Sequence, residues 1–282
     1  MAQLPNLPTK TMGGKQMWAD VYLYGGWRIQ RHVVTQHCRL LDAGDVRQAW
    51  GTEADCIVAL EQARKSGRAS LHSKRLCILI HGYLRAKESF ASLQSRLENE
   101  GFEVYAINYP SSWHDLNLLT TNTAALIKRV SRDFEQVNIV THSMGGIIAR
   151  KALSASPPKG NGRLVMLAPP NQGAHMADLL LSWWPSQHVT GPAGKELVTK
   201  ASSFARNAGA PSCPFLIIAG GRGDNTGYNP ALPGDDDGVV SVQETQLAGA
   251  TEHVVVPALH TFLMNNDEAI QKTVDFLQGR TL

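Results

Sequence analysis

Short, nearly continuous apolar runs alternate with stretches of helical periodicity from residue 75 onward. The run "RLCILIHG" at 75–82 is typical of a strand that is buried on both faces. In the segment after it, Phe90, Leu93 and Leu97 share one helical face, and Gly101 suits the end of that helix. Strands that alternate with helices in this way predict an α/β fold, with a mostly parallel central sheet flanked by helices. Further strands are expected at 102–110, 136–140, 163–170, 214–221 and 252–259.

The N-terminal part of the chain lacks this rhythm. Residues 1–17 carry no clear pattern and are expected to form a loosely held arm. "WRIQRHVV" and "HCRLLD" resemble early strands, which we expect to extend one edge of the sheet in the antiparallel direction. "TEAD" at 52–55 has the form of a capping box and predicts a helix in the residues after it.

Composition excludes several classes of protein. The chain has 282 residues, of which 43% are hydrophobic and 18% charged, which is an ordinary composition for a globular protein. The length suits one large α/β domain or two small ones, and we expect a single domain spanning 1–282. The net charge of +3 is too small to indicate a nucleic-acid partner, and no basic run or zinc-type spacing is present. The four cysteines, at 38, 56, 77 and 213, are far apart in apolar surroundings, which favours free thiols over disulfides.

The N-terminal segment and the length of the apolar runs indicate where in the cell the protein is expected. "MAQLPNLPTKTMGGKQ" contains no apolar segment of the kind that signal peptides carry. The longest apolar runs are far below the length of a membrane span. The expectation is a soluble, cytoplasmic protein without stable membrane insertion.

Ser143 interrupts the pattern in "QVNIVTHSMGGII", between the strand at 136–140 and a helix expected at 145–153. A serine at this place can project from a strained strand-to-helix turn. Side chains at Gly145 and Gly146 would obstruct the close packing of that turn. The amides at the helix start would favour negative charge on a group attached to Ser143. The alternative is that Ser143 only caps the helix.

The segment "HSMGG" resembles the nucleophile elbow of the α/β-hydrolase superfamily, and more narrowly its bacterial lipase and esterase branch. By order of elements, the resemblance covers roughly residues 75–278. One departure is Thr141, which stands where the usual motif has glycine. The resemblance implies an α/β-hydrolase fold with Ser143 as the nucleophile.

The same resemblance gives a role to "LIHGYL" at 79–84. In the lipase pattern, a His-Gly pair after the first central strand opens the loop that binds the oxyanion. It implies an oxyanion hole formed by the amides of Tyr83 and Met144. The alternative is an ordinary turn at the end of a strand.

The catalytic acid is expected in "GDDDGVVSVQE" at 234–244. The lipase-like pattern Asp-Gly-Val-Val implies that the acid is Asp237, with Asp235, Asp236 and Asp224 as rivals. The cluster could also bind Ca²⁺, but it lacks regular ligand spacing, so no metal or other cofactor is expected.

The general base is expected at His260, which follows the strand at 252–259. In this superfamily the base lies on the loop after a late strand. The resulting order of Ser143, Asp237 and His260 is the order of the superfamily.

Residues 171–213 form an insertion where α/β hydrolases carry a lid. "MADLLLSWW" is an apolar helix candidate, and Trp183 and Trp184 at its end are candidates for the substrate pocket, unless this helix simply packs on the body.

The function expected is a serine esterase or lipase that acts on a short- to medium-chain acyl ester or a lipid. The alternatives are a thioesterase, acyltransferase or amidase with the same triad, or a non-catalytic binding protein. The oligomeric state stays open.

Overall fold

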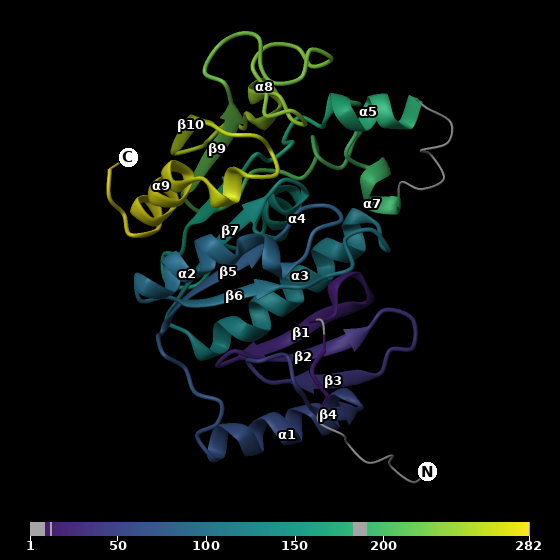
Figure 1. Ribbon diagram of the computed structural model, residues 1–282, viewed down its shortest axis with the longest axis vertical. Coiled ribbons are helices and arrows are strands. Elements are labelled where there is room, and N and C mark those ends of the chain that lie inside the picture. The colour runs from purple at the N-terminus through teal and green to yellow at the C-terminus, as the bar shows by residue number, and fades with distance from the viewer. Residues whose placement is uncertain (1–8, 12, 183–190, 282) are drawn as a thin grey trace.

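A sheet of six parallel strands lies at the centre of the computed structural model, which describes residues 9–11, 13–182 and 191–281 (Figure 1). The order of the strands across the sheet is β10-β9-β8-β7-β5-β6. The predicted parallel sheet is thereby confirmed. The strands are β5 (Arg75–Ile80), β6 (Glu103–Ile107), β7 (Gln136–His142), β8 (Leu164–Leu167), β9 (Phe215–Gly221) and β10 (Glu252–Pro257).

Helices cover both faces of this sheet. Along β5 and β7, Ile78 and Ile139 join the core under α3 and α4, whereas Leu79 and Val140 join the core under α2 and α9. Burial on both faces explains why the strands read as continuous apolar runs. The long helices are α2 (Ala91–Asn99), α3 (Leu116–Val130), α4 (Met144–Ala152) and α9 (Asp267–Leu277); the short segments are α5 (His175–Ser182), α7 (Pro192–Lys195), α8 (Val242–Thr245), η2 (Lys87–Phe90), η3 (Ser131–Asp133) and η4 (Leu263–Asn265).

The N-terminal strands form a second, antiparallel sheet with the order β1-β2-β3-β4. The expectation that they extend an edge of the main sheet is therefore wrong. β1 meets the end of β6 through a backbone hydrogen bond from Asp20 N to Asn108 O (2.9 Å), and buried charged side chains occupy the adjoining space, so the strand ladder does not continue. The elements are η1 (Lys15–Met17), β1 (Trp18–Tyr24), β2 (Trp27–His32), β3 (Cys38–Leu41), β4 (Arg47–Gly51) and α1 (Glu53–Lys65).

Helix α1 begins as its sequence predicts. The Thr52 hydroxyl accepts a hydrogen bond from Asp55 N (3.2 Å), and the Asp55 carboxylate accepts one from Thr52 N (2.9 Å). This capping box satisfies amides that the first helical turn leaves without partners. The helix then buries Cys56 and Leu60 against the N-terminal sheet in a small core of their own.

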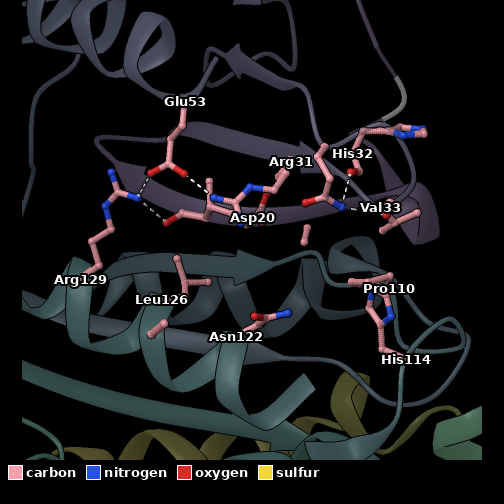
Figure 2. Close-up of a pocket in the computed structure, with 14 residues that line it drawn as sticks. Asp20, Arg31, His32, Val33, Glu53, Pro110, His114, Asn122, Leu126 and Arg129 are labelled. Carbon is pink, nitrogen blue, oxygen red and sulfur yellow. Dashed lines mark hydrogen bonds and ion pairs between the residues drawn. The ribbon is translucent and has the colours of Figure 1, made fainter. Parts of the chain in front are cut away.

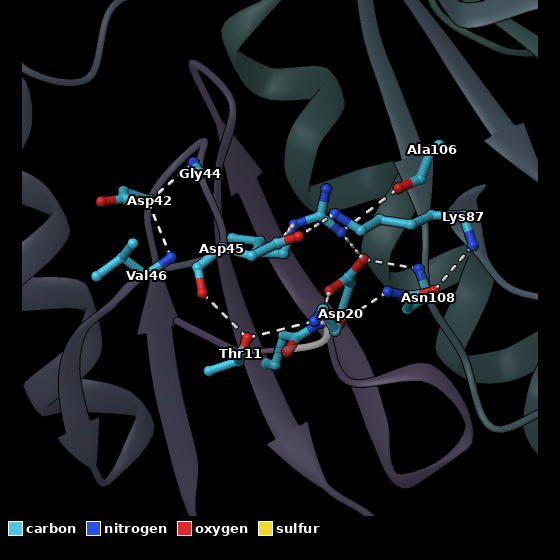
Figure 3. Close-up of polar contacts among 12 residues, drawn as sticks. Thr11, Asp20, Asp42, Gly44, Asp45, Val46, Lys87, Ala106 and Asn108 are labelled. Carbon is cyan, nitrogen blue, oxygen red and sulfur yellow. Dashed lines mark hydrogen bonds and ion pairs between the residues drawn. The ribbon is translucent and has the colours of Figure 1, made fainter. Parts of the chain in front are cut away.

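A buried polar network joins the two sheets (Figure 3). The Asp20 carboxylate is fully buried and accepts hydrogen bonds from Arg28 (2.9 Å), Gln30 (2.8 Å) and Asn108 N (2.7 Å). Since a buried charge is stable only when it is paired and hydrogen-bonded, these contacts fix how the sheets meet.

The segment before β1 takes part in this junction. The carbonyl oxygen of Gly13 accepts hydrogen bonds from Gln30 Nε2 and Asn108 Nδ2, both at 2.8 Å. For the described residues of this segment, the expectation of a loosely held arm is therefore wrong.

A cavity of about 240 Å³ lies between β1, β2 and α3 (Figure 2). At one end, Glu53 accepts hydrogen bonds from Arg31 and Arg129, which lie on β2 and α3. Asn122 and His114 line it farther along. Glu53 thus links the N-terminal sheet to a helix of the main sheet.

Two properties of the chain as a whole follow. All four cysteines are free thiols, as expected. Among the helices that the structure describes, none has both the length and the apolar character needed to span a bilayer.

Candidate active site

A pocket of about 240 Å³ opens at the carboxyl ends of the parallel strands. Ser143 and His260 line it together with the loop after β5, which contains Gly82 and Tyr83. In an open parallel sheet this edge is where ligands bind. The pocket surface is mainly apolar, and its apolar side chains come from the 171–213 insertion and from the loop after β9: Ala174, Met176, Ala177, Leu180, Leu197, Val239 and Val240.

Ser143 occupies a strained turn between β7 and α4. Its backbone has φ 54° and ψ −126°, a conformation that residues other than glycine rarely adopt. Hydrogen bonds hold the turn on both sides, from Ser143 N to Leu167 O (2.8 Å) and from Gly146 N to Ser143 O (2.9 Å). Ser143 is the residue directly before α4, but its side chain makes no capping hydrogen bond. The hydroxyl is therefore not used as the helix cap.

The two glycines after Met144 are required by close packing, as predicted. A Cβ atom on Gly145 would lie 2.4 Å from Ile80 O and 2.7 Å from His81 O. On Gly146 it would lie 2.9 Å from Pro169 Cβ. Real Cβ atoms do not approach other atoms so closely, so side chains at these positions would push α4 away from the sheet.

Thr141 fits the turn despite its departure from the usual glycine. Its side chain is buried, and its hydroxyl donates to Val165 O on β8 (3.3 Å). The extra side chain thus has a place between neighbouring strands.

His260 contacts one of the four candidate acids. Its Nδ1 lies 2.6 Å from Asp237 Oδ2, and its backbone amide donates to Asp237 O (2.8 Å). The other carboxylate oxygen, Oδ1, accepts hydrogen bonds from Val239 N (3.0 Å) and Val240 N (2.7 Å). The carboxylate therefore fixes the orientation of the imidazole ring.

The rival aspartates are occupied elsewhere. Asp235 accepts hydrogen bonds from Arg222 N (2.7 Å) and Gly223 N (3.0 Å). Asp236 accepts from Gly238 N (2.6 Å), and Asp224 binds Thr226. The described residues contain no group of three or more His, Cys, Asp or Glu side chains arranged to hold a metal ion.

Ser143 and His260 share the pocket without a direct hydrogen bond between them in the described structure. His142 connects their loops, because its Nε2 donates to His260 O (3.0 Å) and its ring lies 4.6 Å from the His260 ring. Contacts between a nucleophile and its base are often long in ligand-free enzymes and shorten when substrate binds.

The loop after β5 passes directly against the nucleophile turn. A Cβ atom on Gly82 would lie 3.0 Å from Ser143 Cβ. The amides of Tyr83 and Met144 have no hydrogen-bond acceptor among the described residues. Two unused amides beside a serine hydroxyl form an arrangement that can bind an oxyanion.

Two buried histidines support these loops. His81 donates through Nδ1 to Gly82 O (2.8 Å) and stacks on Tyr109 at 4.2 Å. Burial lowers the pKa of His81 to about 4. Burial, followed by repulsion from His260, lowers the pKa of His142 well below 6.5. Both rings are therefore neutral at neutral pH.

Sequence reasoning missed Gln16, which lies in the segment before β1. Its Nε2 donates to Arg85 O (2.8 Å), and its Oε1 accepts hydrogen bonds from Ser111 Oγ (3.1 Å) and Ser112 N (3.2 Å). Ser111 Oγ in turn accepts from Leu84 N (3.0 Å). No sequence signal reveals this bridge, because it joins residues that are far apart in the chain.

Described residues of the segment expected to be an insertion, 171–182 and 191–213, line one side of the pocket. Met176 and Leu180 on α5 line the pocket, as does Gly194 on α7. Tyr83 Oη accepts a hydrogen bond from Gly191 N (3.0 Å), which connects the insertion to the loop after β5. Trp183 and Trp184 lie outside the described residues.

Comparison with known proteins gives one family match and a set of similar solved structures. The family described as serine aminopeptidase S33 matches residues 72–191. No curated protein matches the chain.

Solved structures resemble most of the chain. The mature lipase BlEst2 of Bacillus licheniformis is 18% identical with a TM-score of 0.56, covering 73% of this chain and 92% of its own. A structure from a study of the metagenome-derived lipolytic enzymes LipS and LipT is 16% identical with a TM-score of 0.53. The match covers 75% of this chain and 96% of that chain. Phospholipase PlaB of Legionella pneumophila gives 16% identity and 0.52, covering 73% of this chain and 63% of its own.

The fold, the strained serine turn and the family match agree with one another. Residues 72–191 match this hydrolase family, and the chain shares its fold with solved structures that include bacterial lipases and esterases.

Proposed function

We propose that the protein is a serine hydrolase of carboxylic esters, with Ser143 as nucleophile, His260 as general base and Asp237 as the acid that orients it. The observation that supports this most strongly is the meeting of three elements at one pocket. Ser143 stands on a strained turn, the His260–Asp237 contact is 2.6 Å, and two unused amides flank the serine.

The chemistry proceeds in two stages. His260 accepts the Ser143 proton while the hydroxyl oxygen attacks the acyl carbonyl, and the amides of Tyr83 and Met144 stabilise the negative oxygen. His260 then gives that proton to the departing alcohol, which leaves an acyl group on Ser143. Water attacks the acyl-enzyme with His260 as base, releasing the acid and restoring the serine.

The size and surface of the pocket favour short- to medium-chain acyl groups. At about 240 Å³ it is smaller than the clefts of roughly 300–1,000 Å³ that bind drug-sized ligands. Its apolar wall suits an acyl chain. We further propose that residues 171–213 form a lid over the acyl side, since α5 and α7 supply much of that wall.

The same residues could cleave a thioester or transfer the acyl group to another alcohol. The test is a hydrolysis profile over p-nitrophenyl esters of rising chain length, with matched thioesters in parallel. We expect ester hydrolysis that is fastest for short to medium chains, and Ser143→Ala should lower it by at least about 10⁴-fold. Full activity in that variant would contradict the proposal, whereas faster thioester cleavage would reassign the substrate.

A further inference from the structure

Arg85 is exceptional in the pocket. Among the described lining residues it is the one side chain with a permanent charge, and its surroundings are mainly apolar. It lies two residues after Tyr83, at the end of the loop that passes the nucleophile turn. Arg85 is half-buried and its contact with Thr261 is exposed, so its guanidinium stands at the rim of the pocket, where it can bind an anionic group of a ligand.

The described residues offer Arg85 no anionic partner. No Asp or Glu oxygen among them lies within 4.0 Å of its guanidinium, although many other arginines of the chain form ion pairs. The undescribed stretches 1–8, 12 and 183–190 contain no acidic side chain. The contact found is neutral, from Arg85 Nη2 to Thr261 Oγ1 (2.8 Å), and it leaves further N–H donors on the planar group.

Its position places this charge on the alcohol side of the substrate. Thr261 directly follows His260, and His260 must deliver a proton to the departing alcohol oxygen. Groups beside His260 therefore face the alcohol part of an ester. The apolar wall from α5 and the 171–213 insertion is left for the acyl chain.

The charge is also held in place before substrate arrives. The backbone of Arg85 is fixed by Gln16 Nε2, which donates to Arg85 O (2.8 Å), and by the bond from Arg85 N to Gly82 O (3.3 Å). The guanidinium is fixed by Thr261. A group held at both ends loses little entropy when it binds a ligand.

A negative group on the alcohol part of a substrate could bind the N–H donors of this guanidinium that Thr261 leaves free, through charge-assisted hydrogen bonds. The arrangement therefore suits a substrate that brings its own negative charge.

We propose that Arg85 forms an anion subsite that selects esters whose alcohol part carries a carboxylate or a phosphate. The inference rests on the proposed ester hydrolysis and names its substrate class. Both anions present paired oxygens that a guanidinium can bind through two hydrogen bonds.

The test compares esters of one acid whose alcohol parts are charged or neutral, and the Arg85 variants separate the effect of charge from the reactivity of each ester. The probes are 4-(butyryloxy)benzoate, its neutral counterpart 4-(butyryloxy)benzamide, and 4-(butyryloxy)phenyl phosphate. We expect the wild type to show a kcat/KM about tenfold higher for the anionic esters than for the benzamide, as one charge-assisted hydrogen bond would give. Each anionic ester is compared with the benzamide by its ratio of kcat/KM values. The anion with the larger ratio, carboxylate or phosphate, is the preferred one.

Variants assign the preference to its residue. Arg85→Gln should bring the ratio close to one, Arg85→Lys should retain part of it, and Arg85→Glu should reverse it. Arg280→Gln removes a positive charge that pairs with Asp275, remote in sequence from the pocket residues, and should keep the wild-type ratio. Because both substrates are measured on the same protein, a loss of folded enzyme does not alter the ratio.

Two results would overturn the inference in different ways. Equal kcat/KM for charged and neutral esters in the wild type, or an unchanged ratio in Arg85→Gln, refutes the anion subsite and leaves ester hydrolysis intact. No hydrolysis of any ester, together with no reaction of Ser143 with a fluorophosphonate, refutes the proposed function and the subsite with it.

Discussion

The two sheets of this molecule are stabilised in different ways. The parallel sheet buries apolar side chains on both faces, as Ile78 and Leu79 do on β5. The N-terminal sheet instead buries charged and polar groups at its junction with the parallel sheet, among them Asp20, Arg28 and Gln30. Apolar burial tolerates the loss of one contact better than a buried ion pair does, because a charge without its partner is strongly unfavourable.

The candidate catalytic residues belong to the parallel sheet, and the N-terminal unit supports the loops around them. The strained Ser143 and the candidate acid and base lie at the edge of the parallel sheet, where extensive apolar burial can sustain local strain. The N-terminal unit supports that edge through the Gln16 amide, which holds the loop after β5, and through Asp45, which pairs with Lys87 just after the loop. Substitutions at the edge of the parallel sheet should therefore lower kcat, whereas substitutions in the buried junction should lower the free energy of unfolding.

The largest effect is expected at the acid in the parallel sheet. Asp237→Asn should lower kcat for ester hydrolysis by about 10⁴-fold, because an amide no longer holds His260 in the required tautomer. Steady-state kinetics measures the loss. Asp235→Asn is the matched control, since the described partners of its carboxylate are the backbone amides of Arg222 and Gly223, and its kcat should stay near that of the wild type. Equal losses in both variants would contradict the assignment of the acid.

The next effect concerns the stability of the N-terminal unit. Asp20→Ala should lower the free energy of unfolding by about 3–5 kcal/mol, because Arg28, Gln30 and the amide of Asn108 lose a buried acceptor, and Asp45, whose Oδ1 lies 3.8 Å from Arg28 Nε, replaces only part of it. Urea unfolding measures this change. Glu61→Ala removes an exposed partner of Arg64 and should change the free energy by less than about 1 kcal/mol. A small effect of Asp20→Ala would show that the polar junction does not hold the sheets together.

Acid should destabilise the protein through its buried neutral histidines. The pKa of His81 is about 4 in the folded chain against an ordinary 6.5, and that of His142 is also lowered. Between about pH 6.5 and pH 4 the unfolded chain binds more protons than the folded chain. The free energy of unfolding therefore falls as the pH falls through this range, by up to about 1.4 kcal/mol per pH unit for each histidine. Urea unfolding at a series of pH values checks this slope, and a flat profile across the window would contradict it.

The smallest effect is expected where the two units meet. Gln16→Met keeps the length of the side chain but removes its hydrogen bonds, so the loop after β5 should shift and kcat should fall about tenfold at similar KM. Gln36→Met is the control, because Gln36 bonds within the turn after β2. A loss of stability without a change in kcat would show that Gln16 supports the fold alone.

Local patterns in the sequence predicted much of the architecture. Continuous apolar runs predicted the parallel strands because burial on both faces demands them, and the Thr52 capping box predicted the start of α1. Gly145 and Gly146 predicted close packing behind the serine turn. Each of these features depends on neighbours in the chain.

Tertiary contacts could not be predicted in the same way. Four aspartates were candidates for the acid, and only the fold shows that Asp237 lies against His260. The separate N-terminal sheet and the Gln16 bridge depend on residues that are far apart in sequence. Arg85 carried no motif that marks it among the other basic residues. The catalytic roles of Ser143, His260 and Asp237 stay predictions until activity is measured.

Reaction with a fluorophosphonate tests the central claim most directly. The reagent phosphonylates serines that a neighbouring base activates, and mass spectrometry identifies the modified peptide. We expect one adduct per chain, located on Ser143, which His260→Ala slows strongly and Ser143→Ala abolishes. A folded wild-type protein that takes up no reagent, or that carries it on another residue, would contradict the claim that Ser143 is the activated nucleophile.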